Sequence, residues 1–233
     1  MQKIFNFFPL SVFKSSISTP QVEKDKMVTE ILNMEDNSKN EGYKTNDSAW
    51  TGDTQGYEFL HENKSFSKLF LEIEKNIKEY LENFSIDHTQ LDLYFQRSWA
   101  TISRQNENIA NHRHAQSHLS FAYYLKKSAD DSKISFFDQS RHNEFIPGFL
   151  DSLSVQKKNL IKSRNVLNSP TILFDVKEDD IVIFPSKSLH GTQKGVLNSE
   201  RISISADIMI VAKNSENLEH LITPLDKWKI FST

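Results

Sequence analysis

The spacing of hydrophobic residues changes once along this 233-residue chain, near residue 90. Before that point it follows the 3.6-residue period of a helix, both over residues 21–34 and, more strongly, over residues 65–83. After that point the period is two. Six segments rich in Ile, Val, Phe and Tyr predict strands, at 91–103, 119–125, 134–137, 171–174, 180–184 and 201–211. Helices followed by many strands favour an α+β, mainly β fold with the helices on one side.

Two segments before residue 60 are less regular. The aromatic-rich stretch 3–14 predicts a short strand, whereas the polar stretch 35–56 predicts a loop. Long loops of this kind often form lids or binding edges, so we expect this one to help select the substrate. No apolar run approaches the roughly 20 residues that cross a bilayer, and no signal-peptide pattern is present. We therefore expect a cytoplasmic protein.

Composition narrows the chemistry that is open to the chain. There is no cysteine, which excludes disulfides, thiolate metal sites and a thiol nucleophile. Lys and Arg total 28 against 31 Asp and Glu, so the basic excess typical of a nucleic-acid binder is missing. Neither Gly-x-Gly-x-x-Gly nor a P-loop occurs, which disfavours dinucleotide and ATP folds.

Three of the eight histidines lie within seven residues. On an extended segment His112 and His114 project the same way, and two imidazoles on one side can share a metal ion. The plain alternative is a polar loop whose histidines are solvated, and a helical segment would instead pair His114 with His118. The alternation over 119–125 favours a strand, which places His118 on the face of Tyr124, as a pocket wall and only second as a ligand.

A second group of polar residues follows the strand at 180–184. His190 lies in the predicted loop after it, and Arg201 and Ser203 share one face of the last strand, with apolar residues on the other. If that strand closes a barrel, Arg201 points inward, where a buried guanidinium requires an anion. The alternative is a half-exposed strand with Arg201 in water.

Together these features resemble the 2-oxoglutarate- and iron(II)-dependent oxygenases, in particular those related to prolyl hydroxylases in marine bacteria and phages. The resemblance covers most of the chain and rests on Ser98-Trp-Ala100, His112-Arg-His114, Leu119-Ser-Phe-Ala-Tyr-Tyr-Leu125, Phe184-Pro-Ser186, His190 and Arg201-Ile-Ser-Ile-Ser205. It implies a double-stranded β-helix, a jelly-roll or cupin-like barrel, as a single domain over residues 1–233. Supporting helices would occupy about 15–85 and the barrel core about 90–212.

The resemblance also implies the site residues. His112 and His190 match metal ligands, and the far carboxylate of 2-oxoglutarate is matched by Arg201, with Ser203 and Tyr124 beside it. Most of the superfamily has a carboxylate where this chain has His114. We therefore expect a three-imidazole site, completed by His118 or water if His114 turns away. Loss of the carboxylate raises the net charge of the site by one unit and leaves zinc and nickel as alternative metals.

The implied reaction uses Fe(II), 2-oxoglutarate and O2. It hydroxylates a C–H bond of an amino-acid or prolyl side chain, or of a small metabolite, and releases succinate and CO2. Two alternatives are a three-histidine cupin-type dioxygenase that does not use 2-oxoglutarate, and a non-enzymatic jelly-roll binding or virion structural module. The expected partner is a small-molecule or peptide substrate, with no nucleic acid and no membrane, and a homodimer is left open.

Overall fold

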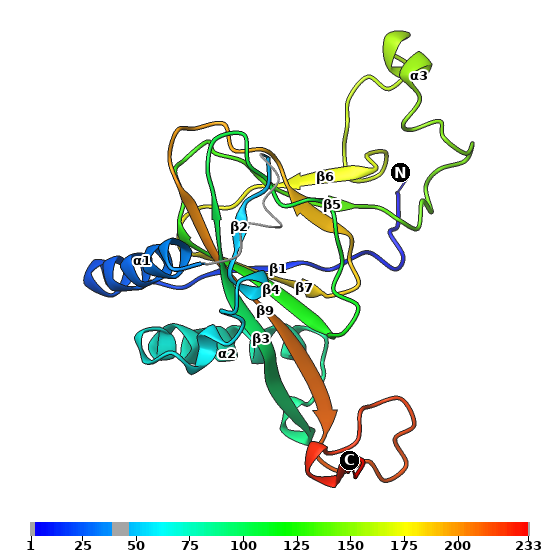
Figure 1. Ribbon diagram of the computed structural model, residues 1–233. Coiled ribbons are helices and arrows are strands. Elements are labelled where there is room, and N and C mark those ends of the chain that lie inside the picture. Colours follow the sequence, from blue (N-terminus) through cyan, green and yellow to red (C-terminus); the bar gives the residue numbers. More distant parts are fainter. Residues whose placement is uncertain (1–2, 39–46, 233) are drawn as a thin grey trace.

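The computed structural model describes residues 3–38 and 47–232, and in these residues two antiparallel sheets face each other (Figure 1). The larger sheet has the order β1-β7-β4-β9-β3-β2 and the smaller one β6-β5-β8. The strands are β1 (Phe13–Ser16), β2 (Trp50–Thr51), β3 (Leu91–Ser103), β4 (Leu119–Lys126), β5 (Ile134–Phe137), β6 (Thr171–Phe174), β7 (Asp180–Pro185), β8 (His190–Thr192) and β9 (Arg201–Ala212). This is the arrangement of a double-stranded β-helix, so the predicted fold class is confirmed.

The six segments with a period of two all form strands, and their bounds agree with the prediction to within one residue. Strand β9 lies between β3 and β4 and pairs with both of them. Because successive side chains of a strand face opposite sides, Ile202 and Ile204 enter the core on one face. Arg201 and Ser203 face the cavity between the sheets on the other.

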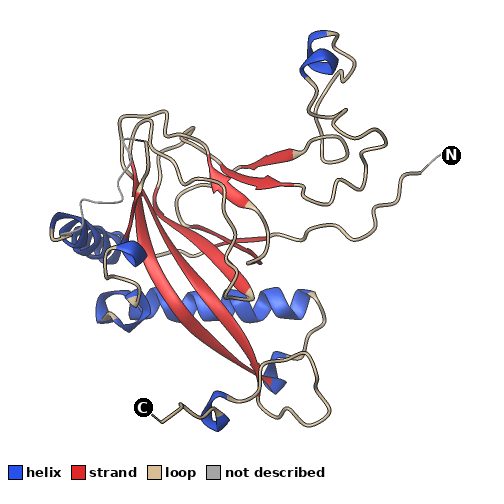
Figure 2. Cartoon of the chain, turned by 45° about the vertical axis from the view of Figure 1, so that its right-hand side comes forward, coloured by secondary structure: helices blue, strands red, loops and turns tan. Residues whose placement is uncertain are grey.

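Two helices, α1 (Gln21–Asp36) and α2 (Ser67–Asn83), cover the outer face of the larger sheet (Figure 2). Their apolar residues pack against the apolar face of the strands in one core, to which Ile31 and Ile73 contribute fully buried side chains. Each such side chain stabilises the fold by about 1.5–3 kcal/mol. A short helix, α3 (Leu153–Lys157), lies outside the barrel. None of the helices in the described residues has the length and apolarity that a bilayer span requires.

A second, smaller core joins the two sheets to each other. Tyr124, Val182 and Phe184 of the larger sheet pack on Ile134 and Phe136 of the smaller one. These residues hold the sheets together beside the cavity. The inner face of β9 therefore lies between the sheets, and its residues Arg201 and Ser203 line the cavity instead of joining the apolar core.

Three local predictions require correction. Of the segment 3–14, only the last two residues are in a strand, and Phe5, Phe7 and Phe8 are more than 70% exposed because no strand pairs with residues 3–12. His190 belongs to strand β8 rather than to a loop. In the segment 35–56, helix α1 continues to Asp36, and residues 50–54 form β2 and a turn of 3-10 helix, whereas residues 39–46 lie outside the described part of the chain.

Candidate metal and cosubstrate site

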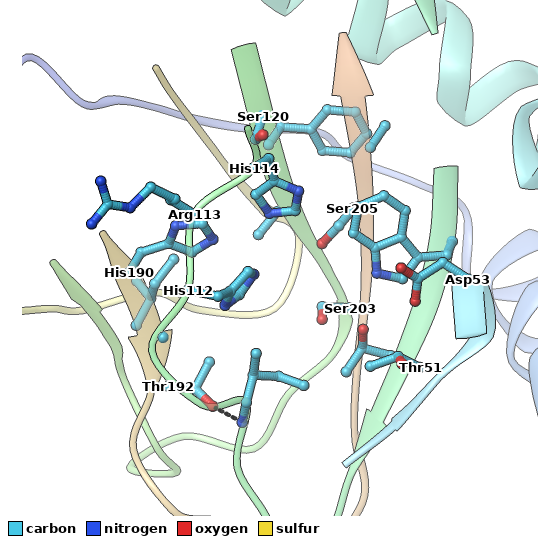
Figure 3. Close-up of a pocket in the computed structure, with 18 of the residues that line it drawn as sticks. Thr51, Asp53, His112, Arg113, His114, Ser120, His190, Thr192, Ser203 and Ser205 are labelled. Carbon is cyan, nitrogen blue, oxygen red and sulfur yellow. Dashed lines mark hydrogen bonds between the residues drawn. The ribbon is translucent and has the colours of Figure 1, made fainter. Parts of the chain in front are cut away.

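A cavity of about 390 Å³ lies between the two sheets. The larger sheet lines it with polar side chains of β3, β4 and β9, and the smaller sheet with β8 and Ile134. The three imidazoles His112, His114 and His190 cluster on one side, and Thr51 and Asp53 lie on the opposite side (Figure 3).

Backbone pairing brings the distant histidines together. The N–H of His112 donates to the carbonyl of His190 at 2.8 Å, and the N–H of His190 donates back at 3.0 Å. The N–H of His114 donates to the carbonyl of Ser186 at 3.0 Å, which fixes the segment against the connection from β7 to β8. The ring centroid of His112 lies 4.4 Å from that of His190 and 4.9 Å from that of His114. One candidate ligand atom from each ring lies within 4.8 Å of the other two.

All three rings use Nδ1 for a hydrogen bond to an oxygen. The acceptors are the backbone carbonyl of Ala110 for His112 at 2.8 Å and that of Ser188 for His190 at 2.9 Å. The carboxylate of Asp207 accepts from His114 at 2.8 Å. A carbonyl oxygen can only accept, so Nδ1 carries the proton in His112 and His190 and leaves Nε2 with its lone pair free.

These free nitrogens fit a transition-metal ion. Two nitrogens bound to one metal at about 2.1 Å each lie at most about 4.2 Å apart. One candidate ligand atom from each ring lies within 4.8 Å of the others, about 0.6 Å beyond this limit. Ligating histidines in proteins are oriented by this kind of hydrogen bond at the second nitrogen.

Burial keeps two of the imidazoles in the neutral form that binds metals. Desolvation among apolar neighbours, helped by the nearby His112 and His114, lowers the pKa of His190 to about 3. The ring of Phe184 packs on His190 with a centroid distance of 4.6 Å. Burial also lowers the pKa of His112. Neither ring has to lose a proton near pH 7 before it can bind a cation.

The other end of the cavity carries a buried cation. Arg201 is 3% exposed and donates to Ser103 Oγ at 3.1 Å, to Thr192 Oγ1 at 3.2 Å and to Ser132. Within residues 3–38 and 47–232 it makes no ion pair with a carboxylate, and its hydrogen-bond partners are neutral, although the charge of the buried Asp131 acts on it from farther away. Burial raises the pKa of the adjacent Tyr124 to about 12, so its hydroxyl remains protonated. A buried guanidinium with neutral partners is suited to an anionic ligand.

Six of the seven residues expected from the sequence line this one cavity: His112, His114, Tyr124, His190, Arg201 and Ser203. The exception is His118, which is exposed and lies outside the cavity. Pairing between β4 and β9 extends past Leu119, so the N–H of His118 donates to the carbonyl of Ile208 at 2.9 Å. Its Nδ1 accepts the N–H of Ile210 at 2.9 Å, which turns the ring toward the strand edge.

Three further residues of the site were not named from the sequence: Asp53, Arg97 and Asp207. Asp207 is fully buried, and the hydrogen bonds and charges of His114 and Arg97 outweigh the effect of burial and hold its pKa below the ordinary value. Trp99 stacks on His114 at 5.7 Å. The signal for Asp207 was present in the sequence, because the alternation of Arg201, Ser203 and Ser205 continues to position 207 on the same inward face.

Comparison with known proteins finds one family model that matches the barrel. Residues 97–207 match the family described as "Putative 2OG-Fe(II) oxygenase", and this range contains every residue expected from the sequence to form the site. That family uses Fe(II), 2-oxoglutarate and O2. No curated protein matches the chain.

Several solved structures share the fold. A prolyl-4-hydroxylase from Pseudomonas putida superposes with a TM-score of 0.54 at 9% identity, over 85% of this chain and 92% of that one. HygX from Streptomyces hygroscopicus, with nickel, 2-oxoglutarate and hygromycin B bound, superposes with a TM-score of 0.52 at 12% identity, over 85% and 82%. The non-heme alpha ketoglutarate dependent carbocyclase SnoK from nogalamycin biosynthesis superposes with a TM-score of 0.57 at 10% identity, over 93% of this chain and 89% of that one.

Proposed function

We propose that this chain is a 2OG-Fe(II) oxygenase that hydroxylates a C–H bond of an amino-acid side chain or a small metabolite and releases succinate and CO2, a proposal that the family match over residues 97–207 supports. The observation that carries the proposal is the pairing of two features in one cavity. Three imidazoles converge with their Nε2 atoms free, and a buried guanidinium without a carboxylate partner among the described residues lines the same space.

His112, His114 and His190 would hold the ferrous ion. When bound, the ion together with O2 would supply the oxidising power that decarboxylates 2-oxoglutarate and hydroxylates the substrate. Arg201 would bind the far carboxylate of 2-oxoglutarate, and the Tyr124 hydroxyl and Ser203 would add hydrogen bonds. The hydrogen bonds at the three Nδ1 atoms keep the rings oriented while the cosubstrate exchanges.

Apolar and aromatic side chains would protect the reaction from water. Phe184 packs on His190, Trp99 stacks on His114, and Ile134 lines the wall of the smaller sheet. A cavity from which water is excluded strengthens the attraction between a guanidinium and a carboxylate. It also limits decarboxylation of 2-oxoglutarate without substrate.

The rim opposite the imidazoles is polar and supports a small or side-chain-sized substrate. It contains Thr51 and Asp53, which belong to the segment predicted to select the substrate, and Asp53 pairs with Arg97 at 3.4 Å. The structural neighbours act on a prolyl residue in one case and hold hygromycin B in another. A polar substrate with hydrogen-bonding groups near the reacting C–H bond suits this rim.

Anaerobic reconstitution with Fe(II) tests the proposal. We expect one equivalent of iron per chain, 2-oxoglutarate binding to the iron-loaded protein, and slow succinate formation when O2 is admitted. The variant His190→Ala should lose iron and succinate together. Iron binding with no effect of 2-oxoglutarate would favour the cupin-type dioxygenase, for which the three-histidine set is the supporting observation. Absence of stoichiometric iron would refute the enzymatic proposal.

A further inference from the structure

We infer that Asp207 is the positioning residue of the third imidazole and supplies, through His114, the negative charge that a carboxylate ligand would give the metal directly. This inference rests on the proposed function, because it requires a metal ion at the three imidazoles. In this chain the carboxylate of the usual two-histidine, one-carboxylate set is replaced by His114. A carboxylate nevertheless lies directly behind the replacement, 2.8 Å from its Nδ1.

The hydrogen bond at His114 differs in kind from those at the other two rings. His112 and His190 each donate to the backbone carbonyl two residues earlier, at Ala110 and Ser188. Such local acceptors carry no net charge. His114 donates instead to a side-chain carboxylate on β9, and an anionic acceptor raises the basicity of the ligating nitrogen more than a neutral carbonyl does.

The carboxylate is fixed by a complete set of donors. Asp207 Oδ2 accepts from Arg97 Nη2 at 2.7 Å, from Arg97 Nε at 3.1 Å and from Gln116 Nε2 at 3.2 Å. Oδ1 accepts from His114 and from Ser117 Oγ at 3.1 Å. Asp207 is fully buried, and a buried carboxylate with these partners cannot rotate away from His114 without leaving donors unpaired.

The strand register creates this arrangement. Arg97 stands directly opposite Asp207 in the β3–β9 pairing, and the register shifts between Phe95 and Arg97. Such a bulge re-aims the side chains that follow it, often beside an active site. Trp99, two residues further on the same face of β3, stacks on His114 at an interplanar angle of 28°. The ring of His114 is therefore held in its plane by Asp207 and from its face by Trp99.

A double-mutant cycle on metal affinity tests the inference without measuring turnover. The dissociation constants of Fe(II) under anaerobic conditions and of Co(II), whose visible spectrum reports the ligand set, are measured for wild type, Asp207→Asn, His114→Ala and the double variant. We expect Asp207→Asn to weaken binding about 10- to 100-fold and to change the Co(II) spectrum. In the His114→Ala background the same substitution should change affinity less than about threefold, because its effect passes through the ring.

Asp180→Asn is the matched control. Asp180 is also a buried strand carboxylate, paired with Lys14 at 2.8 Å, but it does not line the cavity. We expect this variant to lose stability and to keep its affinity for Co(II). Should Asp207→Asn fail to fold, NMR of the zinc-loaded wild type replaces it. The Nδ1 proton of His114 should then resonate clearly downfield of those of His112 and His190.

Any of the following results would overturn the inference while leaving the proposed function intact. They are an unchanged affinity in Asp207→Asn, an equal loss from Asp207→Asn with and without His114, and three equivalent Nδ1 proton resonances. Loss of binding in Asp207→Asn but not in His114→Ala would also overturn it, because Asp207 would then be a ligand itself. A wild type that binds no metal would refute the proposed function and the inference together.

Discussion

Removal of the buried cation is the sharpest test of how this cavity holds its cosubstrate. In Arg201→Ala the far carboxylate of 2-oxoglutarate would enter the same buried space without its partner. Two hydrogen bonds from a guanidinium to a carboxylate contribute about 1.5–3 kcal/mol each. A buried charge that loses its partner costs about 3–5 kcal/mol. Since 1.4 kcal/mol is a factor of ten, we expect the dissociation constant of 2-oxoglutarate to rise about 100- to 1000-fold.

Calorimetric titration of 2-oxoglutarate into the Ni(II)-loaded protein measures this constant without turnover. Arg201→Lys keeps the charge but not the planar fork, so it should lose less affinity than Arg201→Ala. Arg104→Ala is the control, because Arg104 pairs with Glu35 at 2.6 Å and does not line the cavity. The control should bind 2-oxoglutarate within about twofold of wild type.

The result that would refute the reasoning is a folded, metal-loaded Arg201→Ala protein whose 2-oxoglutarate affinity falls less than about threefold. Metal affinity is measured in the same samples. We expect it to be unchanged, because Arg201 donates to Ser103, Ser132 and Thr192 and to none of the three histidines. A parallel loss of metal binding would show that the substitution disturbs the whole cavity.

Three further predictions concern pH, backbone packing and the helices. Between pH 7 and pH 5 the free energy of unfolding of the metal-free protein should fall by about 2 kcal/mol because of His190. In the unfolded chain this imidazole gains a proton near pH 6.5, whereas in the folded chain its pKa is about 3 and it stays neutral. Urea unfolding should show this fall reduced in His190→Asn, and an equal fall would contradict it. Gly191→Ala would bring a Cβ to 2.5 Å from Asn111 Oδ1, beside His112, and should weaken Co(II) binding. Gly195→Ala is the control: its Cβ would lie 2.4 Å from the backbone oxygen of Arg104, and the substitution should only lower the melting temperature. Ile73→Ala should lower the free energy of unfolding by about 2–5 kcal/mol without changing the Co(II) dissociation constant, and altered metal affinity would argue against a purely supporting role for α2.

Much of the fold could be predicted from local pattern. Strand alternation depends only on which side of a sheet each residue faces, so β9 was predicted with Arg201 and Ser203 on one face and Ile202 and Ile204 on the other. Strand β8 was missed because three residues are too few to show a period. Residues 3–12 have the composition of a strand, but no neighbouring strand is in place to pair with them.

The resemblance carried by these motifs pointed to His112, His114, His190 and Arg201 as members of one site, whereas the residues taken singly left a solvated loop and a half-exposed strand open. Only the tertiary structure decided that His118 is excluded and that Asp207 stands behind His114. Both outcomes depend on how β9 pairs with its neighbours on either side, and strand register is set by contacts between segments about 75 residues apart or more. Hydrogen-bond partners across such distances follow from packing, and no local sequence pattern encodes them.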